Sequence, residues 1–212
     1  MKIAIVGASG YVGRAILDEA LARGHEVTAI VRDAAKLAHA ERLKSLALDV
    51  TDIVRAQEAF AHHDAIISAF SGHSHQDVMA RYVTGIRAII EATRRAQVSR
   101  LLVVGGAGSL QVKPGLELLD TPDFPEQWRA TAEGARKALR ILLTEQELSW
   151  TMLSPSAHLE PGAKRGKYRI GLNDLLVDEN GASHIGLGDF ADAMLNELEQ
   201  PQHIRQRFTV GY

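Results

Sequence analysis

The chain contains no cysteine. This absence excludes a disulfide framework, a thiol nucleophile and a cysteine-based metal site. No apolar run reaches the roughly 20 residues that a membrane-spanning helix needs. The formal net charge is only −2, which gives no electrostatic case for a nucleic acid or a membrane surface as partner. Because the first residues look like a core strand rather than a signal peptide, we expect a cytoplasmic protein.

What the chain does contain is typical of a globular protein. Of its 212 residues, 46% are hydrophobic and 24% are charged. This length and composition allow a full hydrophobic core, so we expect residues 1–212 to form one domain. The sequence shows no internal repeat, low-complexity tract or linker.

The most informative stretch is the N-terminal MKIAIVGASGYVGR. A short apolar run at 2–6 predicts a buried strand, and the pattern becomes helical from Tyr11 onward. Between them Gly7 allows a sharp turn, Gly10 lets a pyrophosphate approach the backbone, and Gly13 lets the helix pack on the strand. An anion would then contact free N–H groups at the helix N-terminus. A glycine turn that binds nothing is the alternative, but the flanking strand and helix favour nucleotide binding.

Strand patterns alternate with helical patterns along most of the chain. This order predicts the α/β class, with a Rossmann-like, doubly wound parallel sheet that carries helices on both faces. Strands are expected at 2–6, 26–31, 45–48, 65–70, 101–104, 149–153 and 208–210, and helices from Tyr11 and at 52–62, 76–96 and 126–145.

Two longer segments interrupt the alternation. Residues 105–125 follow the fifth strand as a loop, and the carboxyl end of a parallel strand is where such folds hold substrates. Residues 157–186 are expected to form a small C-terminal insertion on the substrate side. Within it we expect short strands at 167–170 and 175–177 and a turn at 179–181.

Two residues at the end of the second strand bear on the choice of coenzyme. An acidic residue there would bind the ribose 2′-OH of NAD, whereas an arginine would accommodate the 2′-phosphate of NADP. The sequence has Arg32 and then Asp33, and Lys36 adds a further positive charge. Because Arg32 comes first, we favour NADP(H) over NAD(H). The alternative is a solvated helix start with Asp33 as its N-cap, and Asp49 with Thr51 is expected beside the adenine.

An acid–base pair found in many nicotinamide enzymes is missing. Tyr-x-x-x-Lys places both side chains on one helical face, where the lysine lowers the pKa of the phenol. Lys137 lies on a suitable helix, but Glu133 stands four residues before it. Without that proton relay, the chain suits acceptors that take a hydride readily, such as flavins and quinones.

Several segments resemble one branch of the short-chain dehydrogenase/reductase superfamily. The stretch GASGYVG resembles its extended and atypical members. Further along, the chain resembles the bacterial NADH-flavin reductases, an atypical group related to biliverdin reductase B and to NmrA-like proteins. This resemblance covers nearly the whole chain and implies an NAD(P)-binding Rossmann oxidoreductase with a small acceptor. The segments that carry it are LLVVGGAGSL (101–110), DTPDFP (120–125), RGKYRIG (165–171), LLVDENG (175–181) and HIRQRFTV (203–210).

The resemblance also implies roles for individual residues. Ser109 falls near the catalytic serine of the superfamily, although a turn residue in a glycine-rich loop would look the same. No motif assigns a role to His158: from its place three residues beyond Pro155 it would face the acceptor, or it would serve only as a structural or solvent-facing histidine. The other residues would bind the coenzyme: Gly7, Gly10 and Gly13 with the amides of Ser9, Tyr11 and Val12 at the phosphates, Arg32 at the 2′-phosphate, Ala69 and Phe70 along the coenzyme, and Pro155 beside the nicotinamide.

Two further sets of side chains permit a special and an ordinary interpretation. His73 and His75 bracket Ser74, but no other ligand pattern accompanies them, so we expect no metal site. Trp128 and Phe124 would stack on an isoalloxazine ring, or Trp128 would simply belong to the buried face of its helix.

These observations favour an NAD(P)H-dependent reductase of a flavin, a quinone or a similar small acceptor, with FMN and FAD among the candidate substrates. A non-catalytic NADP(H)-binding redox sensor is the second hypothesis, since it needs no acid either. A sugar-nucleotide epimerase or dehydratase is the third, weakened by the missing pair and by a short C-terminal region. We expect a monomer or homodimer whose partner is a small molecule.

Overall fold

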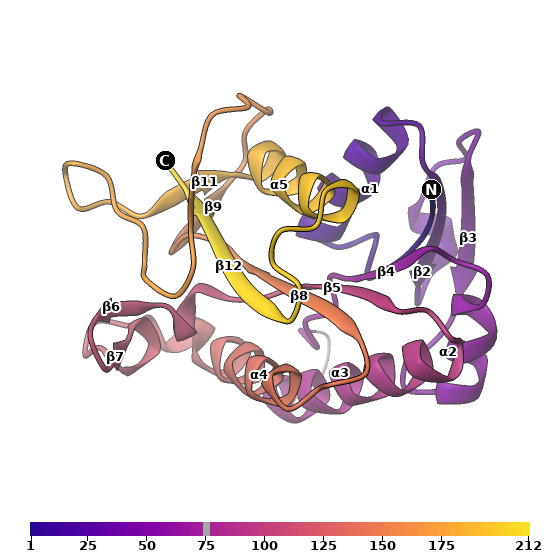
Figure 1. Ribbon diagram of the computed structural model, residues 1–212, viewed down its shortest axis with the longest axis horizontal. Helices are drawn as coiled ribbons and strands as arrows, with labels where there is room; N and C mark the ends of the chain where they lie inside the picture. The colour runs from indigo at the N-terminus through magenta and orange to yellow at the C-terminus, as the bar shows by residue number, and fades with distance from the viewer. Residues whose placement is uncertain (74–76) are drawn as a thin grey trace.

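The computed structural model describes residues 1–73 and 77–212 and is built around one large sheet (Figure 1). Its strands are β1 (Lys2–Val6), β2 (Glu26–Val31), β3 (Leu43–Ala47), β4 (Ala65–Ser68), β5 (Arg100–Val104), β8 (Ser149–Ser154), β10 (Arg169–Gly171) and β12 (Gln206–Gly211). Their order in the sheet is β10-β12-β8-β5-β4-β1-β2-β3. All neighbours run parallel except β10, which pairs antiparallel with β12 at the edge.

Helices cover both faces of this sheet, which confirms the doubly wound α/β prediction. Figure 1 shows α1 (Tyr11–Ala22) and α5 (Leu187–Glu199) on one face. The other face carries α2 (Ile53–Phe60), α3 (Val78–Arg95) and α4 (Glu126–Leu143). Helix α5 was not predicted from the sequence. The predicted helix at 76–96 starts at Val78 as described, and Gln76 lies outside the described residues.

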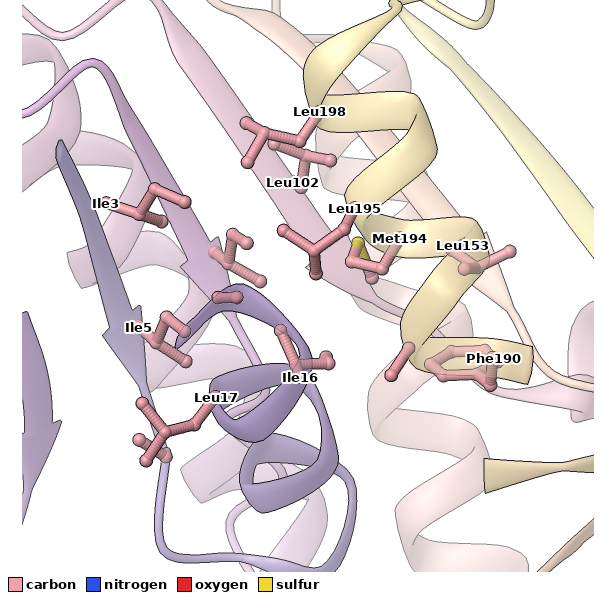
Figure 2. Close-up of a cluster of buried hydrophobic side chains, with 14 of the residues drawn as sticks. Ile3, Ile5, Ile16, Leu17, Leu102, Leu153, Phe190, Met194, Leu195 and Leu198 are labelled. Carbon is pink, nitrogen blue, oxygen red and sulfur yellow. The ribbon is translucent and has the colours of Figure 1, made fainter. Parts of the chain in front are cut away.

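The core is divided by the sheet into two apolar layers. Successive side chains of a strand point to opposite faces, so Ile3 and Ile5 of β1 belong to one layer and Ala4 and Val6 to the other. Figure 2 shows the first layer, where α1 and α5 pack over the central strands. The labelled side chains there are Ile3, Ile5, Leu102 and Leu153 from the sheet, Ile16 and Leu17 from α1, and Phe190, Met194, Leu195 and Leu198 from α5.

The two long segments contain more local structure than the sequence indicates. The 105–125 segment holds two short 3₁₀ turns, η2 (Ala107–Ser109) and η3 (Leu118–Asp120), around the hairpin of β6 (Gln111–Lys113) and β7 (Leu116–Glu117). In the insertion, β9 (His158–Glu160) pairs in parallel with β11 (His184–Gly186). A further 3₁₀ turn, η1 (Ala34–Lys36), follows β2.

The predictions for the insertion are confirmed in part. The strand expected at 167–170 is present as β10, and the turn at 179–181 forms where the Asp178 carboxylate accepts the N–H of Asn180 and Ala182. The prediction of a strand at 175–177 is wrong. Its backbone makes only a local bridge to β6, in which Leu175 N–H donates to the Gln111 carbonyl. Leu176 instead packs close to the glycines of β10 and β12.

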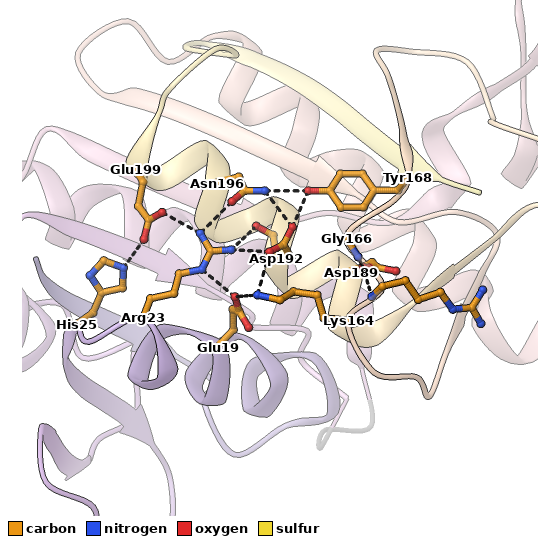
Figure 3. Close-up of polar contacts among 11 residues, drawn as sticks. Glu19, Arg23, His25, Lys164, Gly166, Tyr168, Asp189, Asp192, Asn196 and Glu199 are labelled. Atoms are coloured by element: carbon orange, nitrogen blue, oxygen red, sulfur yellow. Dashed lines mark hydrogen bonds and ion pairs between the residues drawn. The ribbon is translucent and has the colours of Figure 1, made fainter.

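A polar layer ties the insertion to α1 and α5 (Figure 3). Arg23, the C-cap residue that follows α1, donates to the carboxylates of Glu19, Asp192 and Glu199 over distances of 2.7–2.8 Å. Lys164 of the insertion lies 2.7 Å from Glu19, and the Tyr168 hydroxyl donates to Asp192 at 2.9 Å. These contacts therefore hold the insertion against α1 and α5.

Candidate functional site

A cavity of about 1390 Å³ runs along the carboxyl ends of the parallel strands. Its lining comes from the segments that follow β1, β2, β3, β4, β5 and β8, together with α4 and the start of the insertion. This is the edge at which an open parallel sheet binds its ligands. We call the part near β2 and β3 the coenzyme end. The acceptor end is the part lined by His73, by residues 105–108 and 156–161, and by those residues between 118 and 135 that face the cavity, among them Asp123, Phe124 and Trp128.

The glycine turn at the coenzyme end leaves room for a phosphate group. Gly7 has φ +78°, and a Cβ on Gly13 would lie 2.1 Å from the Gly7 carbonyl oxygen. A Cβ on Gly10 would meet only that oxygen, at 3.3 Å. Helix α1 has no side-chain cap and no acidic residue in its first turn, so its first N–H groups remain available to an anion. The turn thus fits a pyrophosphate, as its residue types predict.

Of the charged side chains that follow β2, one lines the cavity and two do not. Arg32 is exposed and lines the cavity. The Asp33 carboxylate accepts the N–H of Ala35 at 3.1 Å and caps η1, as the alternative interpretation of this residue anticipates. Lys36 ends η1 and does not line the cavity. Of the three residues, only Arg32 therefore faces the coenzyme end.

Asp49 also lines this end, and it is paired with an arginine that the sequence analysis missed. Its carboxylate lies 2.6 Å from the Arg81 guanidinium, which lines the cavity as well, and it accepts the N–H and hydroxyl of Thr51 at 3.0 and 2.8 Å. Thr51 itself is not part of the lining. No sequence motif marks a single arginine at the start of a helix, so the position of Arg81 at this site is known only from the fold.

The Asp49 cluster predicts a specific response to acid. Burial alone would raise the pKa of this carboxyl, but hydrogen bonds from Thr51 and Arg81 lower it from 3.8 to about 2. A depressed folded-state pKa stabilises the fold above about pH 4, and this contribution is lost as the pH falls toward 2. We expect the free energy of unfolding of Asp49→Asn to fall less steeply over that range than that of the unmodified chain. Urea unfolding at pH 5, 4 and 3 measures this pH dependence. Asp18→Asn, which removes a carboxylate from an exposed ion pair, is the control. If the free energy of unfolding fell equally steeply in Asp49→Asn and in the unmodified chain, the lowered pKa of Asp49 would be wrong.

The middle of the cavity is lined by Ala69, Phe70 and Pro155, which the sequence analysis placed along the coenzyme. Tyr82 of α3 also lines it, but its hydroxyl donates to the Val104 carbonyl at 3.1 Å, and burial raises the pKa of the phenol. This tyrosine remains protonated and engaged with the backbone. Lys137 contacts the sulfur of Met79 at 3.3 Å and does not line the cavity, so the two do not form a proton relay.

Ser109 does not reach the cavity. Its side chain is only 5% exposed, and its hydroxyl and carbonyl both accept hydrogen bonds from the buried Arg207 guanidinium of β12. The expected role as a hydroxyl donor to the acceptor is therefore wrong. Ser109 is a turn residue of η2, and its contact with Arg207 fixes the 105–125 segment on the last strand.

The acceptor end gathers aromatic and imidazole side chains. Trp128 is 53% exposed and lines the cavity together with Phe124, so the expectation that Trp128 lies in the core is wrong. The His73 ring stands edge-to-face against Trp128, with 6.2 Å between centroids. His158 of β9 is exposed and also lines this end. The helix face to which Trp128 belongs is buried only from Ala132 onward.

Residues 1–73 and 77–212 contain neither a metal-binding cluster nor a membrane-spanning helix. This part of the chain contains no group of three or more metal-ligating side chains; His75, one of the histidines considered above, lies outside it. Over the same residues, no helix combines the length and apolar character required to cross a membrane.

Comparison with known proteins agrees with this geometry. The model of a family described as NAD(P)H-binding matches residues 7–201. The chain belongs to this NAD(P)H-binding family. "Uncharacterized protein YwnB" of Bacillus subtilis is 43% identical and aligns over 99% of this chain and 98% of its own. Together with the neighbours below, the match confirms the Rossmann-type, reductase-like family that the sequence segments resemble.

Two solved structures of similar proteins have names that point to different activities. A Bacteroides thetaiotaomicron protein, provisionally named an epimerase, is 42% identical, with a TM-score of 0.93 over 100% of this chain and 96% of that one. A Streptococcus pneumoniae protein, provisionally named an NADH-flavin reductase, is 34% identical, with a TM-score of 0.88 over 100% and 99%. The family thus supports an NAD(P)H-binding oxidoreductase, and the choice of acceptor depends on the site itself.

Proposed function

We propose that this member of the NAD(P)H-binding family is an NADPH-dependent reductase that transfers a hydride directly to a small planar acceptor of the flavin or quinone class. One observation carries the proposal. The cavity that begins at the glycine turn continues past Pro155 into an acceptor end lined by Phe124 and Trp128. A second ligand with a flat ring would therefore lie next to the coenzyme.

The chain's own residues would act mainly by binding and orientation. The N-terminus of α1 would hold the pyrophosphate, and Arg32 the 2′-phosphate. Ala69, Phe70 and Pro155 would border the nicotinamide, which supplies the hydride from its C4 when the coenzyme is bound. Holding two flat rings together contributes through proximity. Since no tyrosine–lysine relay lies in the described part of the cavity, the reduced acceptor would take its proton from water.

The alternatives are less well supported by this site. An epimerase or dehydratase of this superfamily would need the missing tyrosine–lysine pair. A redox sensor would need no acceptor end beyond the coenzyme, yet about half of the lining belongs to one. A cytoplasmic location and a monomeric or dimeric state stay predictions.

The direct test follows NADPH at 340 nm in the presence of riboflavin, FMN and 1,2-naphthoquinone in turn. Oxidation that depends on one of these acceptors supports the reductase. Tight NADPH binding in a calorimeter with no acceptor-dependent oxidation would instead favour the sensor.

Arg32→Ala should weaken NADPH binding about 30-fold and leave NADH binding nearly unchanged, because a charge-assisted contact to the 2′-phosphate is lost. Isothermal titration with both coenzymes measures this. Lys36→Ala is the matched control, since Lys36 lies nearby but does not line the cavity; we expect a change below about threefold from screened charge alone. Equal losses for NADPH and NADH in Arg32→Ala would show that this residue does not select the coenzyme.

A further inference from the structure

The charge of the acceptor end narrows the class of acceptor. We propose that the acceptor is an uncharged planar molecule, such as a quinone or a flavin without a phosphate group, and that FMN and FAD are poor substrates. This inference rests on the proposed function, because it concerns the second ligand of the same cavity. It departs from the sequence-based interpretation, which includes FMN and FAD among the candidate substrates.

The first observation is the distribution of charged side chains along the cavity. Among the described residues, the lysines and arginines that line it are Arg32 and Arg81, and both lie at the coenzyme end. The acceptor end carries the carboxylates of Asp123 and Glu160 instead, and both residues are exposed. The Asp49 carboxylate offsets the charge of Arg81 at the coenzyme end, so the net positive charge there comes from Arg32. Within the described lining, the coenzyme end is thus net positive, and the acceptor end, where the two carboxylates lie, is negative.

Two arginines of α4 near the acceptor end are already engaged with acidic groups. Arg129 lies over the Phe124 ring at 5.6 Å and donates to the Glu126 carboxylate at 2.8 Å. Arg136 of the same helix donates to three carboxylates, those of Glu117, Asp120 and Glu133. Neither lines the cavity. The residues outside the described ranges are Ser74, His75 and Gln76, which include no lysine or arginine.

A phosphate carries a charge of about −1.5 to −2 at neutral pH. At the acceptor end it would meet Asp123 or Glu160 with no lining arginine or lysine to offset their repulsion. The nearest positive partner of Glu160 is His184, 3.8 Å away, and it is charged only if protonated. An uncharged ring avoids this cost and still gains apolar contact with Phe124 and Trp128.

Matched pairs of acceptors test the inference. Riboflavin and FMN share one ring system, but only FMN carries a negatively charged phosphate. Likewise, 1,2-naphthoquinone is uncharged, whereas its 4-sulfonate derivative carries a negative charge. With NADPH saturating at pH 8 and low salt, we expect kcat/KM to be about tenfold higher for each uncharged member. Added salt should raise the value for FMN more than for riboflavin, because it screens the repulsion.

Variants that remove the two carboxylates test whether they cause the preference for uncharged acceptors. In the double variant Asp123→Asn, Glu160→Gln, the ratio of kcat/KM for FMN to kcat/KM for riboflavin should rise about fivefold. Glu147→Gln, an exposed carboxylate away from the cavity, should leave that ratio unchanged.

A second readout separates this inference from the proposed function. Quenching of flavin fluorescence in the presence of NADP⁺ measures acceptor binding without turnover, and riboflavin should bind more tightly than FMN. Equal or tighter binding and use of FMN would overturn the inference while leaving the reductase intact. Binding of riboflavin with no oxidation of NADPH by any acceptor would instead overturn the reductase. If neither flavin quenches and neither quinone is reduced, the acceptor end does not bind planar rings, and both proposals fail.

Discussion

Glu197→Ala is expected to lower the free energy of unfolding by about 3–5 kcal/mol, since it would leave a buried arginine without its counter-charge. Glu197 and Arg100 are 4% and 8% exposed, and their charged groups lie 3.0 Å apart. The carboxylate also accepts the Thr151 hydroxyl at 3.2 Å and the ring and backbone N–H of His203 at 2.8 and 3.0 Å. Although burial raises the pKa of Glu197, the hydrogen bonds from His203 and Gln202 hold it below its ordinary value, so it is ionised at neutral pH.

Urea unfolding at pH 7 measures the loss. Glu147→Ala is the control, because that carboxylate is 72% exposed in its ion pair with Arg94 and should change stability by less than about 1 kcal/mol. Pairing Glu197→Leu with Arg100→Met should restore much of the stability, since removing both charges leaves neither one buried alone. A loss below about 1 kcal/mol in Glu197→Ala would show that water reaches and solvates Arg100.

Gly13→Ala is expected to reduce NADPH affinity about 100-fold and to destabilise the fold. Its Cβ would lie 2.1 Å from the Gly7 carbonyl oxygen and 2.8 Å from its carbon. Both are backbone atoms, so the start of α1 must move away from the end of β1. A displacement of about 1 Å at a binding group can cost two orders of magnitude, and overpacking adds about 1–3 kcal/mol of instability.

Thermal unfolding and titration with NADPH, carried out on the same samples, separate the two effects. Gly10→Ala is the informative companion, because a Cβ there meets a single backbone oxygen at 3.3 Å. That variant should keep most of its stability and still lose affinity, since its methyl group would stand where the pyrophosphate approaches. If Gly13→Ala bound NADPH within about tenfold of the unmodified chain, the turn would not be the phosphate site.

The parts of the fold that local signals encode could be predicted from the sequence. The glycine turn depends only on residues close together in the sequence. The positive φ at position 7 and the close backbone contact at position 13 both require glycine. Helix α5 did carry a signal in the spacing of Phe190, Met194 and Leu198, which form one buried stripe. It follows an irregular insertion without a strong N-cap residue, and for this reason its start was not recognised.

The parts of the site that depend on distant contacts could not be predicted. Ser109 is removed from the cavity by Arg207, which lies on the last strand. Trp128 has the spacing of a core residue, but the first turns of α4 extend beyond the packed part of the sheet and expose it. Arg81 reaches the coenzyme end because Asp49 holds it there. For Ser109 and Arg81 the deciding partner is far away in the sequence, and for Trp128 the deciding factor is where α4 packs on the sheet.

The covering of one sheet face by helices from opposite ends of the chain has a consequence for biosynthesis. Ile3 and Ile5 lie under α1, but the layer is completed only by α5 and by the contacts of Arg23 with Asp192 and Glu199. A growing chain on the ribosome makes the first strands and α1 long before α5 emerges. Its apolar surface therefore remains open to chaperones, or to other nascent chains, until α5 has been synthesised.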